Sequence, residues 1–155
     1  MTSFGIIAGV ASILGLVASV LAFVQAKRAS AAAKEARDGI ILRTLADEFE
    51  LACTRIDQLL DFIAHGRLAE AALRAGELAS TLSEIPYRRR AYLNQARRND
   101  LIVAKQQIEI LERELSTGRD QLLSPEQKTR FMTRCYEIRE TLRKNLGTIK
   151  GEMEK

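Results

Sequence analysis

The chain has 155 residues, enough for one ordinary domain, and 46% of them are hydrophobic. Two cysteines exclude a disulfide framework, nine glycines and two prolines exclude a fibrous or low-complexity chain, and the apolar content argues against disorder. The net charge of +4 is unevenly distributed, because residues 1–26 carry no charged side chain and all 24 basic and 20 acidic residues follow them.

Residues 4–24 contain only apolar side chains, glycine and serine. As a helix this run spans about 31 Å, close to the ~30 Å hydrocarbon core of a bilayer, so it predicts a transmembrane helix. A cleavable secretory signal is the alternative, suggested by the small residues Ala22, Val24 and Ala26. The length of the run and the absence of Lys or Arg before it favour an uncleaved anchor.

Positive charges directly after the apolar run predict its orientation, since basic flanks stay on the cytoplasmic side. The topology-determining residues are Lys27, Arg28, Lys34 and Arg37. We therefore expect a single-pass protein of the plasma membrane, the inner membrane of a bacterium, with its N-terminus outside. The expected organisation is an anchor over 1–26, a helical linker over 27–39 and a cytoplasmic α-helical domain over 40–155.

Small residues recur at four-residue spacing along the predicted span, which allows close packing of helices in lipid. They are Gly5 and Gly9 on one face, and Ala11, Gly15 and Ser19 on a neighbouring face. This pattern suggests self-association, although small residues are common in all membrane helices.

Apolar residues recur with a period near 3.6 in four later segments, within 41–63, 68–85, 101–115 and 131–153. The pattern predicts an all-α fold, with the N-terminal span followed by an antiparallel bundle of about four helices. Cys135 falls on the apolar stripe of the last segment and is expected in the core. Intermolecular coiled coils are the alternative use of these stripes.

Helix boundaries are predicted from capping and breaking residues. Gly39 is the first plausible interruption after the span, His65-Gly66 is a stop signal, and Pro86 is expected to end the second segment. Ser116-Thr117-Gly118 is expected to stop the third, and Ser124-Pro125-Glu126-Gln127 forms a capping box before the last.

No pattern of catalytic residues is present, so we expect neither an enzyme nor a cofactor, metal or small-molecule substrate. The single histidine, His65, lies four residues after Asp61 and is expected to face solvent at a helix end. Cys53 and Cys135 lack the spacing of metal ligands and fit reduced thiols of a cytoplasmic domain.

Residues 86–99 carry five arginines and no acid, more positive charge than the whole chain has net. The possible anionic-partner patch consists of Tyr87, Arg88, Arg89, Arg90, Tyr92, Arg97 and Arg98. Three interpretations remain open: a turn whose arginines pair with acids of neighbouring helices, a contact with protein or anionic lipid, and nucleic-acid binding. Arg130, Arg134, Arg139 and Arg143 form a second, more diffuse basic face.

These features favour a membrane-anchored module for protein–protein interaction or assembly, with a protein partner or a homo-oligomer. One alternative is an effector that perturbs the membrane by oligomerising through its span. Another is a membrane tether for nucleic acid that uses Arg88, Arg89 and Arg90.

Overall fold

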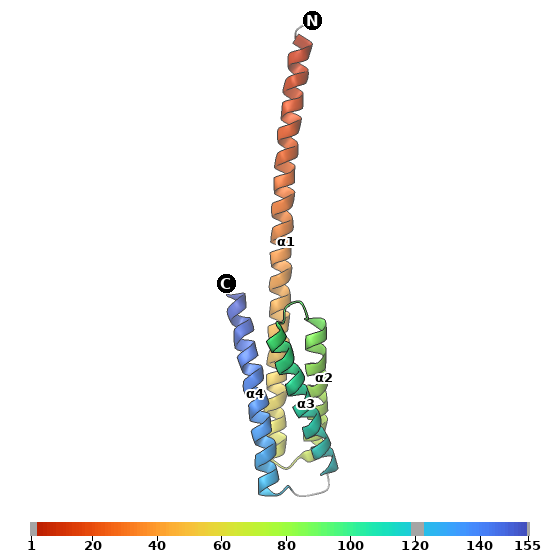
Figure 1. The fold of residues 1–155 in the computed structure, drawn as a ribbon, viewed down its shortest axis with the longest axis vertical. Helices are drawn as coiled ribbons and strands as arrows, with labels where there is room; N and C mark the ends of the chain where they lie inside the picture. The colour runs from red at the N-terminus through yellow and green to blue at the C-terminus, as the bar shows by residue number, and fades with distance from the viewer. Residues whose placement is uncertain (1–2, 119–122, 155) are drawn as a thin grey trace. The chain divides into compact units, whose positions relative to one another are not determined.

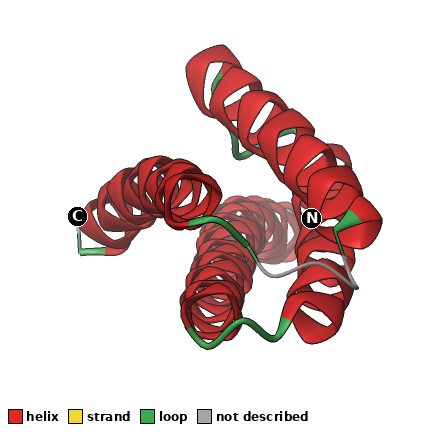
Figure 2. Cartoon of the chain, turned by 90° about the horizontal axis from the view of Figure 1, so that it is seen from below, coloured by secondary structure: helices red, strands yellow, loops and turns green. Residues whose placement is uncertain are grey.

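The computed structural model describes residues 3–118 and 123–154, and the side chains within 16–118 and 123–154. It consists of the helices α1 (Ser3–Ala64), α2 (Leu68–Arg88), α3 (Gln95–Thr117) and α4 (Pro125–Met153), with no strand among the described residues (Figures 1 and 2). The all-α prediction is thus confirmed. The chain divides into two compact units, Met1–Ile41 and Leu42–Lys155.

In the first unit the described side chains of α1 up to Val24 are exposed, and all except Ser19 are apolar. They include Leu16 at 67%, Leu21 at 58% and Phe23 at 71% exposure. By length and composition α1 is long and apolar enough to cross a membrane. Helical hydrogen bonding satisfies the backbone of such a segment internally, as lipid requires.

In the second unit α2, α3, α4 and residues 42–64 of α1 form an up-and-down bundle (Figure 1). Contacts between helix ends define the antiparallel order: Arg89 at the end of α2 reaches Glu48 of α1, and Lys128 at the start of α4 donates to the Ala64 carbonyl at the end of α1. Short connections normally produce this arrangement of neighbouring helices.

The predicted stripes form one continuous core. Its largest fully buried side chains include Phe49 and Ile56 of α1, Leu78 of α2 and Leu111 of α3. Cys135 is also fully buried, as expected. One stripe residue was wrongly predicted: Met153 is 40% exposed, because it is the last residue of α4.

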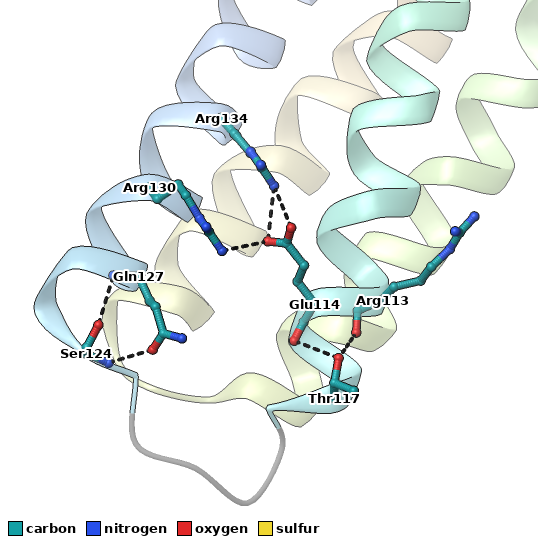
Figure 3. Close-up of polar contacts among 7 residues, drawn as sticks. All are labelled: Arg113, Glu114, Thr117, Ser124, Gln127, Arg130 and Arg134. Atoms are coloured by element: carbon teal, nitrogen blue, oxygen red, sulfur yellow. Dashed lines mark hydrogen bonds and ion pairs between the residues drawn. The ribbon is translucent and has the colours of Figure 1, made fainter.

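Several helix boundaries are confirmed. Gly66, with φ of 71°, follows the end of α1, and Gly118 caps α3. Ser124 and Gln127 form the predicted capping box of α4, with the Ser124 hydroxyl accepting from the Gln127 N–H at 3.2 Å (Figure 3).

Two expected interruptions are absent, because Gly39 and Pro86 both lie inside helices. A glycine costs a helix only about 1 kcal/mol, which its neighbours offset. Pro86 lies two residues before the last residue of α2, and the packing of Leu82 and Ile85 holds this last turn in place. The basic segment is therefore divided between two helices and a short turn.

Candidate functional site: the arginine-rich α2–α3 corner

The sequence-predicted patch spans the last turn of α2, the connection after it and the first turn of α3. Asn94 caps α3, and its side-chain oxygen accepts from the Arg97 N–H at 2.9 Å. This cap makes α3 begin six residues before the predicted apolar stripe, so Arg97 and Arg98 lie on a helix. The structure thereby separates the five arginines into different environments.

Arg89 and Arg97 each form an ion pair with an acid of another helix, and these two pairs connect the helices. Arg89 reaches Glu48 of α1 at 3.0 Å, and both side chains are mostly buried. Arg97, only 8% exposed, forms a two-point contact with Glu152 of α4, at 2.5 and 3.1 Å. The hydrogen bonds that the Arg97 guanidinium donates to this carboxylate raise the pKa of Arg97 above its ordinary value. Both guanidiniums are therefore engaged with acids of other helices, as in one of the three interpretations left open by the sequence.

The remaining arginines of the patch lie at the surface. Arg88 pairs with Glu84 one turn earlier, at 2.9 Å, and both are more than 45% exposed. Arg98 donates to the Gln95 side-chain oxygen at 2.8 Å. Arg90 is exposed, and no acidic partner for it lies within the described part of the chain.

The two tyrosines of the patch differ in burial. Tyr87 is 88% exposed, whereas Tyr92 is half-buried and packs against the core. Of the aromatic rings predicted to flank the arginines, Tyr87 is therefore the one presented for contact with another molecule.

A groove of about 500 Å³ runs between α2 and α3 beside this corner. Its lining is Leu82, Ser83, Pro86, Tyr87, Arg90, Gln95, Arg98, Ile102, Lys105 and Gln106. No acidic residue lines it; Lys105 is paired outside the lining, with Glu109 at 3.1 Å. Sequence reasoning missed Ile102, Lys105 and Gln106, because only the antiparallel packing of α2 and α3 brings them to the arginines.

The more diffuse basic face of α4 is neutralised by acids of the neighbouring helices. Arg130 and Arg134 both contact Glu114 of α3, at 3.2 and 3.1 Å (Figure 3). Arg139 and Arg143 similarly contact Asp57 of α1, at 2.7 and 3.8 Å. These arginines hold the bundle together rather than forming a basic surface.

A buried polar contact that the sequence did not reveal joins α3 and α4. Asn145 is 4% exposed and donates to an Asp100 carboxylate oxygen at 3.2 Å and to the Thr141 carbonyl at 2.9 Å. Because an unpaired buried amide is costly, this pair fixes the register of the two helices.

Candidate residues for nucleophilic or metal chemistry lie apart from one another or inside the core. Burial raises the pKa of the Cys135 thiol to about 12, and that of Cys53 is also raised, mainly by burial. His65 is exposed, as predicted, with Nδ1 2.9 Å from the Asp61 carbonyl oxygen. Among the described residues no three potential ligands gather at a metal site.

The residues that predict the span and its orientation lie on α1. Gly5, Gly9, Ala11 and Gly15 fall outside the residues whose side chains the structure describes, and Ser19 is exposed. Lys27, Arg28, Lys34 and Arg37 are exposed on the helix that continues from the apolar run.

Comparison with protein-family models, curated proteins and solved structures finds no match for this chain. Function is therefore inferred from the apolar run of α1, the helical bundle and the α2–α3 groove.

Proposed function

We propose that this chain is a single-pass membrane protein whose cytoplasmic helical bundle is a protein–protein interaction or assembly module. The observation that carries the proposal is the run of exposed apolar side chains on α1, which includes Leu16, Val20, Leu21 and Phe23. Burying six such half-exposed residues in lipid gains on the order of 5–10 kcal/mol. A soluble chain would leave this surface in water.

The bundle supports a role in binding rather than in chemistry. Its interior is filled mainly with aliphatic side chains, and several of its interhelical cations, among them Arg89, Arg97 and Arg139, are paired with acids. The α2–α3 groove, with Tyr87 and Ile102 at its surface, instead resembles the mixed apolar and arginine-rich surfaces used in protein recognition. Nucleic-acid tethering has a weaker basis, since Arg88, Arg89 and Arg97 are engaged with carboxylates.

Anchoring is tested by fractionating cells that express the full-length chain with a C-terminal tag, followed by an alkaline wash of the membranes. The tagged chain should stay in the membrane pellet. Leu16→Glu combined with Leu21→Glu should release it or cause its degradation, because each central charge costs a span about 2.5–3.5 kcal/mol. Leu73→Glu, at a 66% exposed leucine of the bundle, is the matched control and should change nothing. Recovery of the unaltered chain in the soluble fraction would contradict anchoring.

Assembly is tested by amine crosslinking in intact membranes, which uses Lys105, Lys128, Lys144 and Lys150 of the bundle. A discrete adduct, either a multiple of the chain mass or a complex with a second protein, is the expected result. A chain that yields no adduct, and that sediments as a monomer in detergent, would overturn the proposed role.

A further inference from the structure

The α2–α3 groove differs in charge from the rest of the bundle surface. Three cations line it, Arg90, Arg98 and Lys105, and no acid is among its lining residues; Lys105 pairs with Glu109 outside the lining. Elsewhere on the bundle most cations meet carboxylates of the same or a neighbouring helix. These pairs include Arg67–Glu70, Arg74–Glu77, Arg88–Glu84, Arg89–Glu48, Arg97–Glu152 and Arg139–Asp57.

The groove between α1 and α2 provides an internal comparison. It has a similar volume, about 420 Å³, but Glu48, Glu77 and Glu84 line it together with Arg55 and Arg88. Its charges are therefore largely balanced within the chain. The α2–α3 groove carries a local positive excess that only a molecule from outside can neutralise.

Apolar side chains lie between these cations. Tyr87 is 88% exposed and Ile102 is 47% exposed, and Leu82 and Pro86 contribute to the same lining. Tyrosine and arginine are enriched among the residues that contribute most of the binding energy of protein interfaces, and the groove presents both. A complementary ligand has carboxylates next to an aliphatic or aromatic side chain.

The surroundings of the groove favour a short inserted segment over an extended anionic surface. Carboxylates of Glu84 and Glu48 pair with Arg88 and Arg89, and both line the α1–α2 groove, which shares α2 with this one. A nucleic-acid backbone or an anionic bilayer would meet these carboxylates as well as the arginines, whereas a peptide segment contacts only the groove.

We propose that the α2–α3 groove binds an acidic segment of a partner protein, with Arg90 and Arg98 pairing its carboxylates and Tyr87 and Ile102 receiving an apolar side chain. This inference rests on the proposed role in protein interaction and names the surface and the partner chemistry. It leaves open which other faces of the bundle take part in assembly.

The test uses the full-length chain in nanodiscs of neutral phosphatidylcholine and a random 12-residue peptide library displayed on phage. Selection should enrich sequences that are net negative and contain an aliphatic or aromatic residue. One selected peptide is then synthesised with a fluorophore for anisotropy titration. Arg90→Glu combined with Arg98→Glu should weaken its binding by about tenfold or more, and Ile102→Asp should weaken it as well.

Arg113→Glu is the matched control, because Arg113 is exposed on the same helix and lies outside the groove lining. It should change the affinity less than twofold, and circular dichroism should show that every variant keeps the fold. Enrichment of neutral or basic peptides, no enrichment, or unchanged binding by the double variant would overturn the inference.

A second arm distinguishes lipid from protein, using vesicles that contain 30% phosphatidylglycerol. Co-flotation with these vesicles that depends on Arg90 and Arg98, without selection of acidic peptides, would assign the groove to anionic lipid and overturn the inference. Crosslinked adducts that persist in the double variant, together with no selection of acidic peptides, would show that assembly uses another face. In that case the groove assignment fails while the proposed function stands.

Discussion

Replacing Glu152 by glutamine tests whether Arg97 is a structural residue. Arg97 is 8% exposed, and its side chain contacts both oxygens of Glu152. Breaking a fully buried ion pair costs about 3–5 kcal/mol, whereas exposed pairs contribute about 0.2–1 kcal/mol. Since the Glu152 side chain is 41% exposed, the free energy of unfolding should fall by an intermediate amount, about 1–2.5 kcal/mol.

The assay is urea denaturation of the full-length chain in detergent, followed by circular dichroism at 222 nm. Glu84→Gln is the control, because the Arg88–Glu84 pair is more than 45% exposed on both sides and should contribute less than about 0.5 kcal/mol. Arg97→Met combined with Glu152→Gln should cost less than the sum of the two single substitutions, by about 1 kcal/mol. A Glu152→Gln effect no larger than that of Glu84→Gln would refute the assignment of Arg97 as a residue that joins α3 to α4.

Three further predictions concern the bundle. Gly66→Ala should destabilise it by about 1 kcal/mol, because a φ of 71° is strained for any residue with a side chain. Gly147→Ala, inside α4 with open space around it, should stabilise the bundle by about 0.5–1 kcal/mol. The midpoints of urea denaturation compare the two variants. Equal shifts in one direction would contradict this. Burial should make the Cys135 thiol resist Ellman's reagent in the folded chain and Cys53 react sooner, so rapid labelling of Cys135 before unfolding would be contrary evidence. Hydrogen bonds from the backbone and from Arg67 lower the pKa of Glu70 from 4.5, so its contribution to stability is present above that pH and is lost as the pH falls through the lowered pKa. Glu70→Gln should therefore make the stability of the bundle fall less steeply at acid pH. An unchanged acid dependence would be inconsistent with this reasoning.

The helical architecture could be predicted because the signals that specify it are local. A 3.6-residue apolar period identifies the buried face of a helix without knowledge of its neighbours, and the Ser124 capping box lies within four residues. Pro86 shows where local reasoning fails: the packing of Leu82 and Ile85 keeps α2 helical beyond the expected stop. The start of α3 was missed because its cap, Asn94, precedes a polar first turn with no apolar stripe.

The candidate site could be predicted only in part, since its chemistry depends on contacts between distant residues. The arginine-rich segment was visible in the sequence, and pairing with acids of neighbouring helices was one of the interpretations considered. Which arginines are paired could not be read from the chain, because Glu48 lies 41 residues from Arg89 and Glu152 lies 55 residues from Arg97. Lys105 and Ile102 join the groove for the same reason, through packing rather than sequence proximity.

The central claim is that the apolar part of α1 anchors a bundle on the cytoplasmic side of a membrane. The most direct measurement is protease protection of a C-terminal epitope on the full-length chain in bacterial spheroplasts. The account predicts that the epitope survives protease added outside and is digested only after the membrane is permeabilised. Digestion of the epitope in intact spheroplasts would place the bundle outside and contradict the account.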